Sequence, residues 1–175
     1  MILYQGVPGA FSHEACLTFA AGEEPVPAAS FALVASGVAD GRAEFGMLPL
    51  ENSIAGEVPG VRALIEAAGL RIAAEHVLPV RLHLLALEDA VLGEVRVVAS
   101  HPMALKQCAR TLARLGLAAE EAENTAVAVR NLARKDQAAL GSDAAARIYG
   151  RRVLMRDLQD EAGNATRFAL VSRGS

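Results

Sequence analysis

The sequence has 175 residues, of which 53% are hydrophobic and 21% charged, so it excludes a disordered chain and supplies a sizeable apolar core. Aromatic residues make up only 4% and Trp is absent, which predicts an aliphatic core. The 17 basic and 20 acidic residues give a net charge of −3, which argues against nucleic acid or an acidic membrane as a partner.

The membrane, targeting and cysteine signals of the sequence all indicate a cytoplasmic protein. No apolar run reaches the roughly 18 residues that a membrane span needs. The first residues carry neither a basic region nor a signal-like apolar stretch, so we expect a cytoplasmic protein. Cys16 and Cys108 lie far apart, without CxxC or Cys/His ligand spacing. We therefore expect no structural zinc and no disulfide framework.

Short apolar runs alternate with helical segments along the chain, a pattern typical of an α/β fold. In the first half, the pattern predicts strands over 2–4 and 44–49 and helices over 12–20, 31–39 and 60–68. An apolar, strand-like stretch follows over 70–87, and Pro79 interrupts it. We expect this stretch to leave one sheet and enter another.

The second half continues the alternation, and no connecting segment is long enough to separate independent domains. The predicted strands cover 95–99, 117–121, 138–140, 152–154 and 167–172, and the predicted helices cover 102–115, 126–134 and 143–149.

A hydroxyl residue stands at the start of several predicted helices, directly after a strand: Ser12, Ser100, Thr125 and Ser142. One interpretation is that they only cap the helices. In an open α/β sheet, however, such junctions lie at the carboxyl ends of strands, where ligands collect. Helix N-termini there suit a carboxylate or phosphate.

Three further segments carry polar residues between a strand and the next element. The turn at 6–12, GVPGAFS, lacks the lysine of a P-loop and the GxGxxG spacing, so it gives nucleotide binding little support. The segment 48–53, LPLENS, ends an apolar strand in three polar residues and is equally compatible with an ordinary turn. The segment 164–168, NATRF, enters the last predicted strand, where Arg167 is compatible with a solvated position.

Together with SHPMALKQC at 100–108 and NTA at 124–126, the segments GVPGAFS, GMLPLENS and NATRF resemble the prephenate dehydratase family. They occur in the family's order and spread over nearly the entire chain. The resemblance implies a lyase that converts prephenate, a dicarboxylate, to phenylpyruvate, carbon dioxide and water in phenylalanine biosynthesis. It implies no cofactor and no metal.

The resemblance also implies an architecture. We expect a two-lobed, type II periplasmic-binding-protein-like α/β fold with a ligand cleft between the lobes. Lobe one would comprise 1–78 and 155–175, and lobe two 79–154. The sequence stops shortly after NATRF, so we expect no C-terminal ACT regulatory domain. Family members assemble, which predicts a homodimer or homotetramer.

In the family, the threonine of the TRF motif has the key catalytic role, and here it is Thr166. Arg167 is the candidate for pairing with a substrate carboxylate in bidentate geometry. Adjacent strand residues point to opposite faces, so a regular strand cannot send both side chains into one cleft. Either the strand starts after Thr166, or Arg167 acts from behind and holds the loop.

The other predicted substrate-binding residues follow from the same motifs. Asn52 and Ser53 are expected to contact the substrate or to support residues that do, and Glu51 beside a dianion needs pairing or protonation. The remaining members of this set are Gly9, Ser12, Ser100, His101, Thr125, Ala126, Asn164 and Phe168. The chain departs from the family's usual pattern at Ala10, commonly threonine, and at Met103, commonly glutamine.

Two other functions are compatible with the sequence. Prephenate decarboxylases share the fold and lose carbon dioxide without aromatising the ring, although an intact NATRF segment favours dehydration. A non-catalytic, small-anion binding module of periplasmic-binding type is the other alternative.

Overall fold

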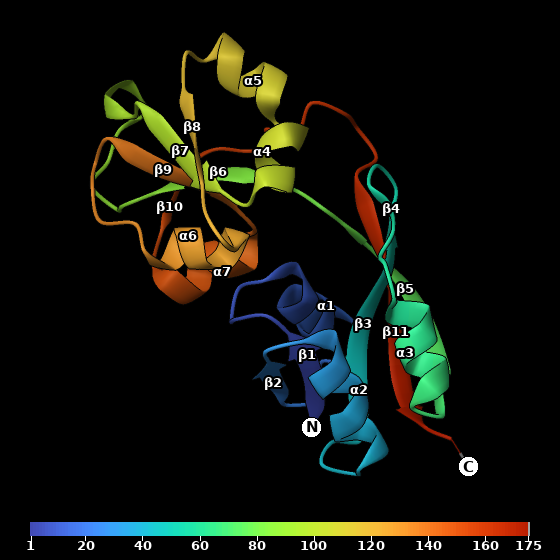
Figure 1. Cartoon of the computed structure of the whole chain (residues 1–175). Helices are drawn as coiled ribbons and strands as arrows, with labels where there is room; N and C mark the ends of the chain where they lie inside the picture. The colour runs from blue at the N-terminus through green and yellow to red at the C-terminus, as the bar shows by residue number, and fades with distance from the viewer. Residues whose placement is uncertain (175) are drawn as a thin grey trace. The chain divides into compact units, whose positions relative to one another are not determined.

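The computed structural model describes residues 1–174 and divides into two compact units. Unit 1 contains Met1–Val7, Phe11–Val80 and the chain from Gly163 onward. Unit 2 contains Pro8–Ala10 and Arg81–Ala162. The chain thus divides at 80/81 and 162/163, where the sequence predicted 78/79 and 154/155. Each unit has its own mixed sheet with helices (Figure 1), which confirms the predicted α/β class.

The sheet of unit 1 has the strand order β2-β1-β3-β11-β5. Its parallel part is β2, β1 and β3, whereas β11 is antiparallel to both β3 and β5, and the short β4 pairs with β3. The strands cover Ile2–Gln5 (β1), Pro25–Ala28 (β2), Phe45–Asn52 (β3), Gly56–Glu57 (β4), Leu70–Pro79 (β5) and Ala165–Arg173 (β11).

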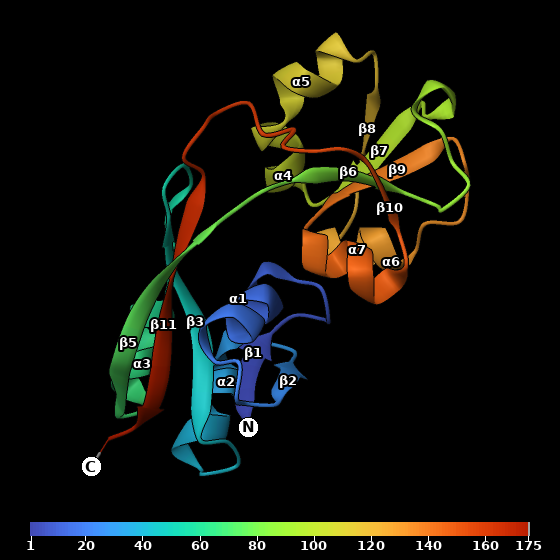
Figure 2. The ribbon, with the colours of Figure 1, turned by 180° about the vertical axis from the view of Figure 1, so that it is seen from behind.

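Helices cover this sheet on both faces: α1 (Phe11–Phe19), α2 (Phe31–Ala39) and α3 (Val61–Ala67). Strand alternation sends successive β3 residues to different cores. Met47 packs with Cys16 of α1, while Leu48 packs with Val34 of α2 and Ile65 of α3. Figure 2 shows the long strands β3, β11 and β5 that these helices cover.

The sheet of unit 2 has the strand order β10-β6-β9-β7-β8, with β8, β7 and β9 parallel. The strands cover His83–Ala86 (β6), Val97–Ser100 (β7), Ala118–Glu121 (β8), Gln137–Gly141 (β9) and Arg152–Met155 (β10). The helices are α4 (Pro102–Gln107), α5 (Ala109–Arg114), α6 (Thr125–Arg130) and α7 (Asp143–Tyr149), with a 3₁₀ turn η1 at Leu92–Glu94. Alanines and leucines between α6, α7 and the sheet form the core, as the composition predicts.

The single helix predicted over 102–115 is wrong, because the structure breaks it at Cys108 into α4 and α5. The carboxylate of Asp160 accepts hydrogen bonds from the backbone N–H groups of Arg110 and Thr111, each at 2.9 Å. The Asp160 N–H in turn donates to the carbonyl of Gln107 at 2.7 Å. A distant segment thereby satisfies groups that a continuous helix would bond internally.

Two other differences have local causes. Helix α6 ends four residues before the predicted limit of 134. The Arg151 guanidinium donates to the carbonyls of Val129 and Arg130 in its last turn and to that of Leu132 just beyond it. Strand β2 was not predicted, because Pro25 and Pro27 weaken the strand pattern. It lies at an edge of the sheet, where proline is tolerated. Among residues 1–174, no helix is long and apolar enough to cross a membrane.

Candidate active site

The predicted catalytic threonine lies where β3 and β11 pair at the carboxyl end of the parallel strands of unit 1. Thr166 is directly opposite Asn52, and Arg167 is directly opposite Glu51. The register shifts between Arg167 and Phe168, so that β3 has one extra residue there. Directly opposed residues share a face and neighbouring residues alternate. The Thr166–Asn52 pair and the Arg167–Glu51 pair therefore project from opposite faces of the sheet.

The Asn52 amide holds the Thr166 hydroxyl. Asn52 Oδ1 accepts from the backbone N–H groups of Ile54 at 2.9 Å and Ala55 at 3.0 Å, which fixes the orientation of the amide. Asn52 Nδ2 consequently faces β11 and donates to Thr166 Oγ1 at 3.0 Å. The same nitrogen approaches Asn164 Oδ1 at 2.9 Å and the Ala165 carbonyl at 3.2 Å.

This contact decides what the Thr166 hydroxyl can do. Oγ1 accepts a hydrogen bond from Asn52, and within residues 1–174 it donates to no protein acceptor. A hydroxyl has one donor and two acceptor positions. The Thr166 proton is therefore available for a bound molecule, which makes Thr166 a candidate hydrogen-bond donor or acid.

Ser53 fixes the backbone that leads into Thr166. The Ser53 N–H donates to the Ala165 carbonyl at 2.8 Å, and the Ala165 N–H donates back to Ser53 Oγ at 2.9 Å. Ser53 Oγ also donates to the Gly163 carbonyl at 2.9 Å. The hydroxyl is thus engaged by the protein, which favours the supporting role over direct substrate contact.

Arg167 meets two carboxylates on the other face. Its Nε lies 3.2 Å from Glu51 Oε1 on β3, and its Nη1 lies 3.4 Å from Glu75 Oε2 on β5. Glu51 therefore has the partner that its charge requires. Because β11 already includes Ala165 and Thr166, the structure favours the alternative in which Arg167 acts from behind the catalytic face. Glu75 was missed, since nothing in the local sequence pattern indicates its partner.

Two predicted site residues of unit 1 are buried. Phe168 is 1% exposed and packs against Ile2, Tyr4 and Met47, so its side chain belongs to the core. Ser12 lies inside the first turn of α1, which begins at Phe11, so the prediction that it caps this helix is wrong.

In unit 2, Gly9 is held against α7. Its carbonyl accepts from Ser142 Oγ at 3.1 Å, and the Pro8 carbonyl accepts from the Tyr149 hydroxyl. Gly9 has φ +90°, and a Cβ there would lie 3.0 Å from the Ala145 Cα. Both the backbone conformation and the close approach require glycine. Ser142 caps α7 as predicted, with its Oγ accepting from the Ala145 N–H at 3.0 Å.

The other predicted caps of unit 2 are displaced by one residue. His101, not Ser100, caps α4, with Nδ1 accepting from the Met103 N–H at 3.1 Å. Asn124, not Thr125, caps α6 through Oδ1. Ser100 Oγ nevertheless lies 3.4 Å from Thr125 Oγ1, so two hydroxyls meet at the carboxyl end of β7. Ala126 is 1% exposed and packs in the core.

The structure thus collects the predicted residues into two groups. Unit 1 holds Glu51, Asn52, Ser53, Asn164, Thr166 and Arg167, and unit 2 holds Gly9, Ser100, His101 and Thr125.

Burial raises the pKa of each thiol, Cys16 and Cys108, to about 12, so neither supplies a thiolate at neutral pH. Across residues 1–174, no three His, Cys, Asp or Glu side chains gather closely enough to hold a metal ion.

Comparison with known proteins identifies relatives of this chain. The family model for prephenate dehydratase matches residues 2–175. A bifunctional N-acyl-homoserine lactone acylase/prephenate dehydratase of Komagataeibacter europaeus is 39% identical, over 99% of this chain and 63% of that protein. A chloroplastic arogenate dehydratase/prephenate dehydratase of Arabidopsis thaliana is 37% identical, over 98% of this chain and 46% of that protein. The chain thus spans less than two thirds of these relatives.

Solved structures agree on the fold. A prephenate dehydratase from Arthrobacter aurescens, in complex with L-Phe, has a TM-score of 0.87 and 27% identity, over 99% of this chain and 60% of that chain. A periplasmic substrate-binding protein of a Coxiella burnetii ABC transporter has a TM-score of 0.51 and 14% identity, over 99% of this chain and 84% of that chain. The latter likeness supports the periplasmic-binding-protein-like fold alone, whereas the matching family model extends over residues 2–175. The chain belongs to the prephenate dehydratase family.

Proposed function

We propose that this chain is a prephenate dehydratase, which converts prephenate to phenylpyruvate, carbon dioxide and water in phenylalanine biosynthesis. The observation that carries the proposal is the Thr166 hydroxyl, which accepts from Asn52 Nδ2 at 3.0 Å and keeps its own proton for a ligand. This threonine belongs to the segment NATRF at 164–168, which matches the TRF motif of the family.

The reaction breaks two bonds that join substituents to the ring of prephenate. The carbon–carbon bond to the ring carboxylate breaks and releases carbon dioxide, and its electron pair enters the ring. The carbon–oxygen bond to the ring hydroxyl breaks at the opposite position, and the oxygen leaves as hydroxide with the electron pair of that bond. Aromatisation makes the overall change favourable, so the protein has mainly to help a poor leaving group, hydroxide, to depart.

Thr166 supplies that help in our proposal. As negative charge grows on the departing oxygen, the hydrogen bond from Thr166 Oγ1 to that oxygen strengthens, and this lowers the barrier. Threonine is too weak an acid to stay deprotonated, so solvent supplies the proton that converts hydroxide to water. The donation from Asn52 occupies one lone pair of Oγ1 and directs its proton away from β3.

Arg167 takes a positioning role in this mechanism. Its guanidinium is paired with Glu51 and Glu75, and it ties β11 to both neighbouring strands. These contacts hold the strand that carries Thr166. Substitution of Ser100, His101 or Thr125 and measurement of KM for prephenate would test the substrate-binding roles predicted for these residues.

The test is an assay of the purified chain with prephenate, in which phenylpyruvate is followed by its absorbance in alkali. We expect phenylpyruvate to form, and Thr166→Val to abolish most of the rate. A non-aromatic, decarboxylated acid as the product would assign the chain to the decarboxylases instead. Binding of prephenate without turnover would favour a non-catalytic binding module.

The names of two relatives define the competing substrates. Arogenate carries an amino group where prephenate has the keto group, and its dehydration gives phenylalanine rather than phenylpyruvate. Parallel assays with arogenate and with an N-acyl-homoserine lactone therefore discriminate among the three activities. Faster turnover of arogenate, or release of a fatty acid from the lactone alone, would overturn the assignment to prephenate.

Assembly and location complete the proposal. We infer a cytoplasmic homodimer or homotetramer, on the basis of the family. Sedimentation at micromolar concentration tests the assembly, and a strictly monomeric active species would contradict it.

A further inference from the structure

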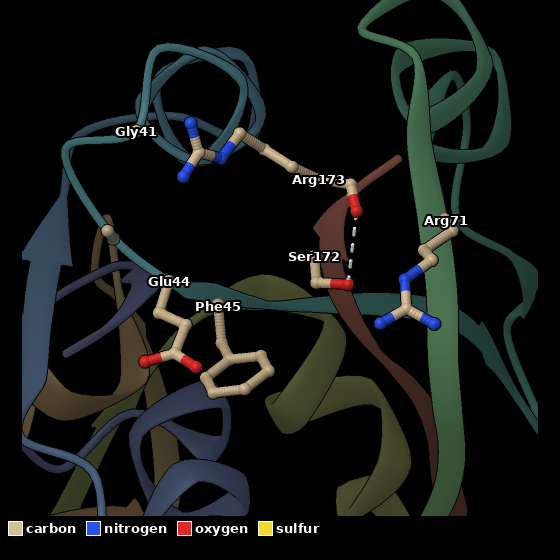
Figure 3. A pocket seen from close by; sticks show the side chains of 7 residues that line it. Gly41, Glu44, Phe45, Arg71, Ser172 and Arg173 are labelled. Carbon is tan, nitrogen blue, oxygen red and sulfur yellow. Dashed lines mark hydrogen bonds between the residues drawn. The ribbon is translucent and has the colours of Figure 1, made fainter. Parts of the chain in front are cut away.

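A hollow of about 460 Å³ lies at the end of the unit 1 sheet that is remote from Thr166. It is formed by the loop before β3, the first residue of β3, the start of β5 and the end of β11 (Figure 3). Thr166 and Ser172 are six residues apart on β11, which corresponds to about 20 Å along a strand. The hollow is therefore separate from the candidate active site, and its size lies within the range of small-molecule sites.

Two arginines and one glutamate line this hollow without neutralising one another. Arg71 and Arg173 form no ion pair with any carboxylate of residues 1–174, and Glu44 forms none with an arginine or lysine. The Met1 ammonium is attracted to Glu44, but it hydrogen-bonds to Glu23. Two guanidinium groups and one carboxylate, none of them in an ion pair within residues 1–174, thus face the same space.

The remaining lining groups complete a binding surface. Phe45 and the hydroxyl of Ser172, a residue only 7% exposed, lie between Glu44 on one side and Arg71 on the other (Figure 3). Arg173 extends over Gly41, where a Cβ would lie 3.0 Å from its Nη1. Gly41 has φ +76°, so a side chain there is disfavoured both by the backbone and by the guanidinium.

We propose that this hollow binds an acidic α-amino acid, of the glutamate or aspartate type. The two guanidinium groups bind its two carboxylates, and the Glu44 carboxylate binds its ammonium group. The Phe45 ring contacts its methylene carbons. Guanidinium groups suit carboxylates because they donate paired hydrogen bonds in a planar arrangement.

Charge complementarity selects this class over simpler anions. The charged lining groups sum to two positive charges and one negative charge, which a ligand with two carboxylates and one ammonium matches group by group. Phosphate or a plain dicarboxylate would satisfy the arginines but would leave Glu44 facing an anion, and like charges in contact cost binding energy. An apolar amino acid would leave one guanidinium without a partner.

The test is calorimetric titration of the intact chain with three probes that differ by one group each. L-glutamate has all three charges, L-glutamine lacks the distal carboxylate, and glutarate lacks the ammonium group. We expect L-glutamate to bind with a Kd below about 1 mM and each of the other two at least about tenfold more weakly, which is about 1.4 kcal/mol. Equal binding of the three, or no binding of L-glutamate at about 10 mM, would overturn the proposal.

Variants connect the binding to the lining groups. Arg71→Gln and Arg173→Gln should each weaken L-glutamate at least about tenfold and weaken glutarate similarly. Glu44→Gln should weaken L-glutamate but not glutarate, because glutarate has no ammonium group. Arg62→Gln is the matched control, since Arg62 is an exposed arginine of the same unit that lies near Glu57. Loss of L-glutamate binding in this control, or unchanged L-glutamate binding in both arginine variants of the lining, would refute the site. Either result would be independent of any dehydratase activity.

Discussion

Thr166 and Arg167 are neighbours on β11, but their side chains have different partners. On one face, Asn52 donates to the Thr166 hydroxyl and leaves its proton free. On the other face, Glu51 and Glu75 occupy the Arg167 guanidinium. One side chain is prepared for a ligand, and the other is satisfied by the protein.

This difference suggests a division of labour within the TRF segment. A group that acts in the transition state needs a fixed position and an unused donor, and Thr166 has both. A group that holds strands together needs partners on both sides, and Arg167 has these. Substitutions on the first face should therefore lower kcat. Substitutions on the second face should mainly lower the free energy of unfolding, because they weaken the contacts that hold the strand.

The largest effect is expected for Thr166→Val. Valine keeps β-branching and nearly the same volume, so the strand and its packing should survive, and only the hydroxyl is lost. We expect kcat to fall about 10²–10⁴-fold, or roughly 3–5 kcal/mol of transition-state stabilisation, with KM changing much less. Steady-state kinetics with prephenate measures both.

Thr166→Ser is the matched control, since it retains the hydroxyl and should keep a measurable part of the activity. A folded Thr166→Val enzyme within about threefold of the original kcat, a change of only ~0.65 kcal/mol, would remove Thr166 from the mechanism.

Asn52→Asp should follow, because it reverses the hydrogen bond without changing the size of the side chain. Oδ1 still accepts from Ile54 and Ala55, but the second oxygen cannot donate to Thr166. The Thr166 proton then turns toward residue 52 and is withdrawn from the ligand. We expect kcat to fall about 10²-fold, within the range given for a positioned proton donor.

The double variant Asn52→Asp/Thr166→Val discriminates this explanation from a general loss of structure. If Asn52 acts through Thr166, the double variant should be little slower than Thr166→Val alone. Multiplication of the two effects would show that Asn52 acts independently.

Ser53→Ala should have a smaller effect on rate. It removes the hydroxyl that binds both the Gly163 carbonyl and the Ala165 N–H, while the backbone bond from Ser53 to Ala165 remains. We expect the free energy of unfolding to fall by about 1–3 kcal/mol. A looser Thr166 should lower kcat about tenfold, at the lower end of what precise positioning contributes.

Ser53→Thr keeps the hydroxyl and should restore part of both values, which thermal unfolding and steady-state kinetics together can measure. A stable Ser53→Ala enzyme with a raised KM and an unchanged kcat would show instead that Ser53 contacts the substrate directly.

Local sequence patterns predicted those parts of the fold that depend on neighbouring residues. The helices Phe31–Ala39 and Asp143–Tyr149 begin and end where their hydrophobic patterns indicate. Pro79 ends β5, as its missing N–H predicts, and the next strand belongs to the other sheet. The break at Cys108 could not be predicted, because its cause is the distant carboxylate of Asp160.

The same distinction applies to the candidate site. The motif supplied Thr166, whereas strand alternation left two alternatives for Arg167: a strand that starts after Thr166, or a position behind the catalytic face. The structure decides between them, because β11 already includes Thr166. The partners of these side chains depend on which strands are adjacent and in what register. Asn52 and Thr166 are 114 residues apart, and Glu75 and Arg167 are 92 residues apart. No local pattern contains that pairing, so only the structure shows that Arg167 is already neutralised.

On the Arg167 face we expect the smallest effect, because the protein already pairs this side chain with two carboxylates. A double-mutant cycle of Arg167→Gln and Glu51→Gln should give a coupling free energy of about 0.2–1 kcal/mol, because both side chains are partly exposed and solvent screens the pair. Chemical denaturation of the four proteins measures this value. Arg167→Lys should leave kcat within about threefold of the original value, because an ammonium still pairs with Glu51. Unlike the guanidinium, the ammonium cannot pair with both carboxylates in one planar fork. A Glu51→Gln variant with native kinetics, beside an Arg167→Lys variant whose KM rises more than about tenfold, would show that Arg167 binds the substrate carboxylate. In that outcome the two faces of β11 would both serve the ligand, and the division of labour proposed here would be wrong.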